Sequence, residues 1–219
     1  MPRIVFEKKG RAVWISHLDL MRLFQRAFKR AGLHLTHTQG FNPRPSVSIA
    51  LPLSVGVESS CELLDFEISG EEVSCDEIRC RLNENLIEGV KVLGVCKKGR
   101  KLKELTLLSC KITLEYDEGV NQDAQQQIRE LFSRDEVVVP KKTKNGIQDQ
   151  NIIPMIRRLE IVCKDENTLQ ITALICCQNP ALNPMQLVHA IKNYLPDLEP
   201  SFAKCSRLEV YDEQEKVFR

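Results

Sequence analysis

The order in which strand-like and helix-like segments alternate constrains the fold of this chain more than any other feature. Apolar residues that alternate with period two predict a strand, whereas apolar residues at positions i, i+3 and i+4 predict a helix. In the first half of the 219 residues these patterns follow the order β-α-β-β-β-α-β, and the second half repeats that order. No residue-level identity accompanies the repeat, so it is a repeat of topology.

The predicted helices cover residues 17–31, 74–88, 121–133 and 184–195. The predicted strands, the first of which turns at residues 8–11, cover residues 3–15, 33–38, 46–53, 61–68, 90–95, 107–116, 136–139, 155–163, 168–176 and 205–212. Two segments are predicted as loops: 39–45, where Pro43 and Pro45 exclude helix, and 141–150, which contains Asn145-Gly146.

This order predicts an α+β fold of two tandem ferredoxin-like units, each an antiparallel sheet with its helices packed on one face. The predicted units are residues 1–99 and 106–219, with a boundary between Gly99 and Leu105. A chain of this length is also long enough for one large domain, so a single continuous α+β sheet is the rival prediction.

The strongest local pattern is the predicted helix at 17–31. Ser16 followed by Asp19 is a capping-box signature, and Gly32 supplies a stop after the last apolar position. The apolar face is made by Leu20, Leu23, Phe24, Ala27, Phe28 and Ala31. The opposite face carries Arg22, Arg26, Lys29 and Arg30.

Composition excludes several protein classes. The net charge is +1, the mean hydropathy is −0.24, and no apolar run is long enough to span a membrane. Residues 1–14 show no export signal and the nine cysteines are odd in number, so we expect a cytoplasmic protein with reduced thiols. No C-x-x-C occurs, and from this spacing we expect no metal or cofactor bound by this chain.

Charge is distributed unevenly along the sequence. Residues 1–50 hold nine Lys and Arg residues against two acids, a net charge of +7, whereas residues 51–95 have a net charge of −7. Residues 97–103 (KKGRKLK) add five positive charges, which fit either a strip that contacts phosphates or a solvated linker.

The candidate residues for binding nucleic acid or substrate are Arg22, Arg26, Lys29, Arg30, Gln39, Phe41, Asn42 and Arg44. Phe41 fits either a core anchor or a platform on which a base stacks.

Two residues are candidates for catalysis, with structural alternatives for each. His17, at the start of the predicted helix, fits an acid or base, a phosphate contact or a packed cap residue. Glu58 fits an acid in the same cleft or an ion-pair partner for a loop arginine. His34 and His37 lie three apart on a predicted strand and would therefore face opposite sides, which disfavours a shared metal.

Several motifs occur in a fixed order: SHLDLMR (16–22), GFNPRP (40–45), ALPLSVGVES (50–59) and PMIRRLE (154–160). In this combination the chain resembles a bacterial radical-SAM-linked protein family of unknown function, whose members stand alone or are fused behind a radical SAM enzyme. The resemblance implies a radical SAM enzyme as partner, which would use S-adenosylmethionine and an iron–sulfur cluster. This chain lacks the three-cysteine motif that such a cluster needs.

Three functional hypotheses remain open at this point. The favoured one is a non-catalytic accessory protein that binds RNA or a nucleotide-bearing substrate for the radical SAM partner. One alternative is an RNA-processing or RNA-modifying enzyme with a ferredoxin-like fold, a hypothesis that rests on fold analogy. The other is a protein–protein scaffold that docks through the acidic segment 51–95.

Overall fold

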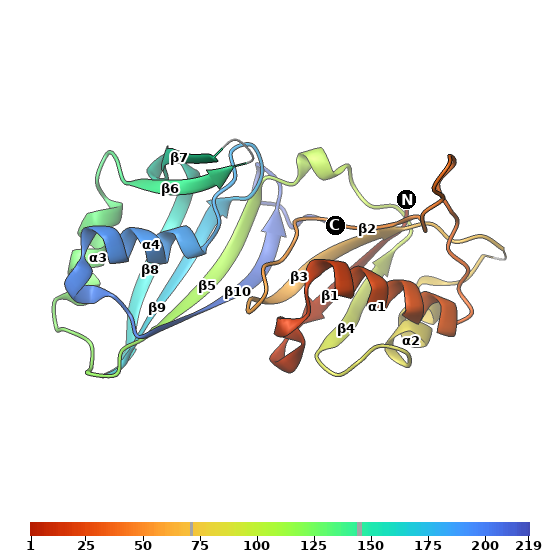
Figure 1. Ribbon diagram of the computed structural model, residues 1–219, viewed down its shortest axis with the longest axis horizontal. Coiled ribbons are helices and arrows are strands. Elements are labelled where there is room, and N and C mark those ends of the chain that lie inside the picture. The colour runs from red at the N-terminus through yellow and green to blue at the C-terminus, as the bar shows by residue number, and fades with distance from the viewer. Residues whose placement is uncertain (71, 144–145) are drawn as a thin grey trace. The chain divides into compact units, whose positions relative to one another are not determined.

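The computed structural model describes residues 1–70, 72–143 and 146–219, without the side chains of 142 and 143. Within these residues the protein is α+β, with four α-helices and antiparallel strand pairs (Figure 1). The chain divides into two compact units: unit 1 comprises Met1–Glu104 and Val217–Arg219, and unit 2 comprises Leu105–Lys216.

Unit 1 is a small antiparallel sheet with two α-helices. Its elements are β1 (Arg3–Lys8), the 3-10 helix η1 (Gly10–Trp14), α1 (His17–Arg30), β2 (Val47–Ile49), β3 (Glu58–Phe66), α2 (Cys75–Asn83), β4 (Val90–Cys96) and the 3-10 helix η2 (Leu102–Glu104). β1 pairs with both β3 and β4, and β2 pairs with the other edge of β3. The spatial order is therefore β4-β1-β3-β2.

Both helices of unit 1 pack on the same face of this sheet. Phe6 of β1 meets Phe24 of α1 with ring centroids 4.7 Å apart, and Phe28 meets Phe66 of β3 at 5.1 Å. The same apolar core includes buried residues of α2 and β4: Ile78, Leu82, Val90 and Val92. Because α1 buries one side so completely, its remaining side is left for solvent.

The local signals around α1 are confirmed. The hydroxyl oxygen of Ser16 accepts a hydrogen bond from the backbone N–H of Asp19 at 3.2 Å, and the same hydroxyl lies 2.8 Å from the Asp19 carboxylate. Gly32 follows the helix with a φ of +69°, a conformation that glycine adopts without steric cost. The chain can therefore reverse direction directly after α1.

Two strand predictions in unit 1 were wrong in part. Residues 10–14, predicted as the second arm of a hairpin, form η1, because Lys9 donates its N–H to the carbonyl of Gly89 and Gly10 adopts a φ of +55°. Residues 33–38 make only two isolated bridges, Leu35 with Ile68 and His37 with Pro45. A proline has no N–H to donate, so a ladder through Pro45 cannot continue.

Unit 2 contains antiparallel strands, two α-helices and a two-stranded hairpin. Its elements are β5 (Leu107–Glu115), α3 (Ala124–Phe132), β6 (Val138–Thr143), β7 (Gly146–Asn151), the 3-10 helix η3 (Ile153–Met155), β8 (Ile156–Asp165), β9 (Thr168–Cys176), α4 (Met185–Tyr194), the 3-10 helix η4 (Pro196–Leu198) and β10 (Phe202–Tyr211). β5 pairs with β10 and β9, and β9 pairs with β8, which gives the order β10-β5-β9-β8. Figure 1 shows α3 and α4 in front of these strands.

The predicted polar loop at 141–150 was wrong. Residues 138–143 and 146–151 pair as the strands β6 and β7 of a separate hairpin. Hydropathy patterns do not predict a hairpin of polar strands, and most side chains of β7 are exposed. Asn145, which the sequence places in the turn, lies outside the described residues.

The last three residues pack on unit 1 through a buried cation. Arg3 is 2% exposed, and its guanidinium donates two hydrogen bonds to Asp65 at 2.6 and 2.9 Å. The ring of Phe218 lies 5.1 Å from the Arg3 guanidinium and also 5.1 Å from that of Arg100. Phe218 is fully buried, and it covers the Arg3 guanidinium, whereas the Asp65 side chain is 17% exposed.

Burial controls the chemistry of the cysteines in unit 2. Burial raises the pKa of Cys110 and Cys177 to about 12 and that of Cys205 to about 11. A thiol must lose its proton to become a nucleophile. Cys163 of unit 2 and Cys80 of unit 1, by contrast, are exposed.

We predict that Asp65→Asn destabilises unit 1 strongly. The substitution leaves the buried charge of Arg3 without a counter-charge, a change that costs about 3–5 kcal/mol. Urea unfolding followed by circular dichroism gives the free energy of unfolding. The matched control is Asp76→Asn in the exposed pair with Arg79, for which we expect a change below about 0.5 kcal/mol. Equal losses in both variants would contradict the prediction.

We also predict that the folded protein reacts with a thiol reagent at pH 8 only where cysteines are exposed. Cys80 and Cys163 should be modified within minutes, whereas Cys110, Cys177 and Cys205 stay protonated and covered because their pKa values lie well above 8. Peptide mass spectrometry identifies the modified sites, and the same reaction in urea is the control in which all of these cysteines react. If Cys110 in the folded protein is labelled as fast as Cys80, the prediction is wrong.

Candidate functional site

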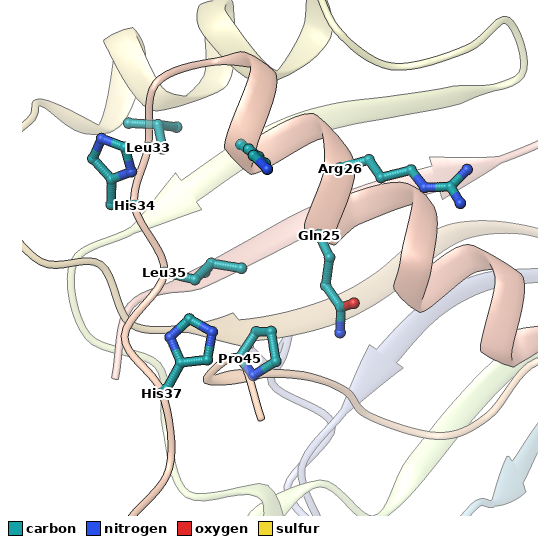
Figure 2. A pocket seen from close by; sticks show the side chains of 8 residues that line it. Gln25, Arg26, Leu33, His34, Leu35, His37 and Pro45 are labelled. Atoms are coloured by element: carbon teal, nitrogen blue, oxygen red, sulfur yellow. The ribbon is translucent and has the colours of Figure 1, made fainter. Parts of the chain in front are cut away.

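Unit 1 has a pocket of about 430 Å³ between α1 and the segment that follows it (Figure 2). Three of the residues that line it come from α1, four from the returning segment 33–37, and one from the end of the proline-rich loop. They are Gln25, Arg26, Lys29, Leu33, His34, Leu35, His37 and Pro45.

The pocket exists because the chain turns back at Gly32. Leu33 donates its N–H to the carbonyl of Phe28 at 2.9 Å, which holds the returning segment against the last turn of α1. Leu33 itself is 3% exposed and closes the floor. Pro45 is held beside His37 by their bridge and by the Thr38 N–H, which donates to the carbonyl of Arg44 at 2.8 Å.

The prediction that His34 and His37 face opposite sides was wrong. Both histidines line the same pocket, because residues 33–38 are not a regular strand and period two does not hold there. Figure 2 shows both imidazoles on the returning segment, with the His37 ring beside the ring of Pro45 and Gln25 reaching toward that proline from α1.

The four basic residues predicted on α1 differ in what they contact. Arg22 pairs with Asp19 at 3.0 Å, and Arg30 donates to the carbonyl of Asn85 at 2.8 Å. The pKa of Asp19 is lowered, first by the hydrogen bond from Ser16 and then by Arg22, so this carboxylate stays charged beside its arginine.

Arg26 and Lys29 are the two cations of α1 that line the pocket. Both are exposed, and neither side chain forms a hydrogen bond or ion pair with another residue that the structure describes. The charge of Arg26 contributes to the lowered pKa of Asp19 at the start of the helix. No aspartate or glutamate lines the pocket. An exposed, unpaired cation can exchange water for an anion, which a cation already bound to a carboxylate does less readily.

The loop residues predicted to bind all reach solvent. Gln39, Phe41, Asn42 and Arg44 are exposed, and the ring of Phe41 is fully exposed. This excludes a core-anchor role for Phe41. The four stay candidates for binding, and the pocket itself takes only Pro45 from this loop.

The two candidates for catalysis lie outside this pocket. His17 is half-buried at the start of α1, and Glu58 is half-buried at the start of β3, where its carboxylate lies 3.4 Å from the backbone N–H of Gly10. Both remain untested candidates.

Several other predicted cations have internal roles. Arg3 and Lys8 are buried, with the Lys8 ammonium donating to the carbonyl of Ile15 at 2.8 Å. In the 97–103 run, Lys97 pairs with Glu72 and Arg100 with Glu104. The +7 of the first fifty residues therefore overstates the charge that is free to attract a ligand.

The described residues offer neither a metal-binding cluster nor a helix that could cross a membrane. No cluster of three or more His, Cys, Asp or Glu residues within 1–70, 72–143 and 146–219 has an arrangement that could hold a metal ion. None of the described helices is long and apolar enough to cross a membrane.

Sequence reasoning missed most of this pocket. It named Arg26 and Lys29 but not Gln25, His34, His37 or Pro45 as partners of those cations. The glycine stop after α1 was the available signal, because a chain that turns at Gly32 can run back beside the helix.

Comparison with solved structures shows a distant likeness of fold. A crystal structure of a Cbf5-Nop10-Gar1 complex aligns with 97% of this chain and 50% of its own chain, at 9% identity and a TM-score of 0.51. The archaeal box H/ACA sRNP Nop10-Cbf5 complex aligns with 94% and 46%, at 10% identity and a TM-score of 0.44. An unknown protein from Galdieria sulphuraria aligns at 8% identity with a TM-score of 0.27, over 94% of this chain and 96% of its own.

This chain thus spans about half the length of the first two of these chains. No curated protein matches its sequence. A profile of the family described as "Uncharacterized protein conserved in bacteria (DUF2344)" matches residues 2–184, and the chain therefore belongs to that family.

Proposed function

We propose that this protein is an RNA-binding accessory protein without catalytic activity of its own, built from two ferredoxin-like units near residues 1–99 and 106–219. The orders β4-β1-β3-β2 and β10-β5-β9-β8 support this proposal. Numbered along the chain within each unit and with the β6–β7 hairpin set aside, both orders read 4-1-3-2, as the ferredoxin-like fold requires.

The observation that carries RNA binding is the pair of unpaired cations at an apolar pocket. Arg26 and Lys29 line the pocket together with the apolar residues Leu33, Leu35 and Pro45. The backbone of RNA offers phosphates to the cations, and its unstacked bases offer flat apolar faces to the floor. The loop that supplies Pro45 also presents the fully exposed Phe41 ring, on which a further base can stack.

A radical SAM enzyme as partner remains part of the proposal. It rests on the motifs at 16–22, 40–45 and 50–59 alone, since neither the family description nor the names of the structural relatives mention such an enzyme. Under this proposal S-adenosylmethionine and the iron–sulfur cluster belong to the partner.

The two alternative functions have less support. His17 and Glu58 lie outside the pocket, so no observation joins them to the residues proposed to bind RNA. The acidic segment 51–95 is a weak docking face, because several of its carboxylates are already paired within unit 1: Asp65 with Arg3, Glu72 with Lys97, Asp76 with Arg79, and Glu77 with Arg81.

We predict that the double variant Arg26→Ala/Lys29→Ala binds an unstructured RNA 12-mer at least tenfold more weakly than the unmodified protein at 50 mM salt. Each phosphate contact on a single strand contributes about 0.7 to the slope of log affinity against log salt. Loss of two contacts should therefore flatten that slope by about 1.4, measured by fluorescence anisotropy between 50 and 200 mM salt.

The matched control is Arg79→Ala/Arg81→Ala, which removes two arginines of α2 that are each paired with an acid. We expect this control to keep the affinity and the salt slope of the unmodified protein. The proposal fails if the unmodified protein does not bind the RNA at 50 mM salt, or if the two double variants lose affinity equally.

A further inference from the structure

We infer that the pocket beside α1 is a site for one nucleotide, with the base on the floor near His37 and Pro45 and the phosphate on Arg26 and Lys29. This inference rests on the proposed RNA binding, since it names the part of the ligand that this pocket takes. The same chemistry is offered by a free nucleoside monophosphate and by an unpaired nucleotide within a strand.

The size of the pocket fits a single nucleotide. At about 430 Å³ it lies in the lower part of the range typical of small-molecule sites, about 300–1,000 Å³. A base-paired helix would have to remain on the surface, and only a nucleotide turned out of its stack can enter.

One side of the pocket has the apolar and ring-bearing side chains that a base can contact. Leu33, Leu35 and Pro45 give an apolar floor, and the His37 ring stands beside the Pro45 ring (Figure 2). Histidine is one of the side chains on which unstacked bases stack in RNA complexes. Gln25 adds an amide that both donates and accepts hydrogen bonds, as the edge of a base requires.

The walls suit a phosphate on the other side. Lys29 lies four positions after Gln25 and three after Arg26, spacings at which helix side chains are neighbours, so Lys29 lies next to both on the surface of α1. Neither side chain forms an ion pair among the described residues, and no acid lines the pocket, although the charge of Arg26 also acts on Asp19 at the start of α1.

Other ligand classes fit these walls less well. A divalent cation would meet two positive charges and no carboxylate. A wholly apolar ligand would cover the two cations without giving them a partner, which is unfavourable. An acidic peptide satisfies the cations but brings no planar ring for His37 and Pro45. A ligand that joins a phosphate to a base gives a partner both to the two cations and to the apolar residues and rings of the pocket.

The test measures binding of uridine and adenosine monophosphate, ribose 5-phosphate, a tetra-aspartate peptide and the RNA 12-mer at pH 8. We expect the nucleoside monophosphates to bind at least tenfold more tightly than ribose 5-phosphate and the peptide, and to displace the 12-mer from the protein. We expect His37→Ala to weaken both nucleotide and RNA by about five- to a hundredfold, the effect of losing one stacked base.

His37→Ala should leave the salt slope of RNA binding unchanged, because the stacked ring neutralises no phosphate. The matched control is His189→Ala, an exposed histidine of α4 in unit 2, which should bind every ligand as the unmodified protein does. Because both histidines are exposed, neither variant should alter the fold, and circular dichroism checks this.

The outcomes separate the two proposals. RNA binding that depends on Arg26 and Lys29, but is not displaced by nucleotides and not weakened by His37→Ala, overturns the nucleotide site and leaves the RNA proposal standing. Nucleotide binding without RNA binding supports the site for a free nucleotide and overturns the RNA proposal. Peptide binding as tight as nucleotide binding overturns the nucleotide site.

Discussion

The packing of α1 on the sheet of unit 1 determines where the candidate site can lie. Phe24 and Phe28 lock one side of the helix against Phe6 and Phe66, so the helix cannot rotate without opening the core. This fixes Gln25, Arg26 and Lys29 beside the buried stripe, at the border with solvent. A pocket at such a border has an apolar floor and a charged rim, which is the combination on which the proposed binding of nucleotides depends.

Charge counted along the sequence and charge available on the surface are different quantities in this protein. Arg3 and Lys8 are buried, Arg22 is paired with Asp19, and Arg30 contacts a backbone carbonyl. Only the cations that lack such contacts are available to attract a ligand. The same holds for the acidic segment, in which Asp65 and Glu72 are already paired. Neither segment acts as a uniform charged patch.

The sequence predicted the fold better than the site, for a physical reason. Caps and apolar periodicity are local, so α1 and its Ser16 cap followed directly from residues 16–32, and the order of the strands followed from their spacing. The β6–β7 hairpin was missed because its polar strands lack that periodicity. The pocket was missed because it brings residues of α1 together with His37 and Pro45, which an isolated bridge joins, and contacts between distant residues leave no periodic pattern in the sequence.

The covering of Arg3 by Phe218 has a consequence for synthesis of the chain. Unit 1 receives this aromatic ring from residues that follow unit 2 in sequence, after more than a hundred intervening positions. A ribosome therefore releases almost all of unit 1 before the ring that covers its Arg3 guanidinium exists. Until translation reaches Phe218, Arg3 lacks this aromatic partner, and the first unit to emerge is the last to be completed.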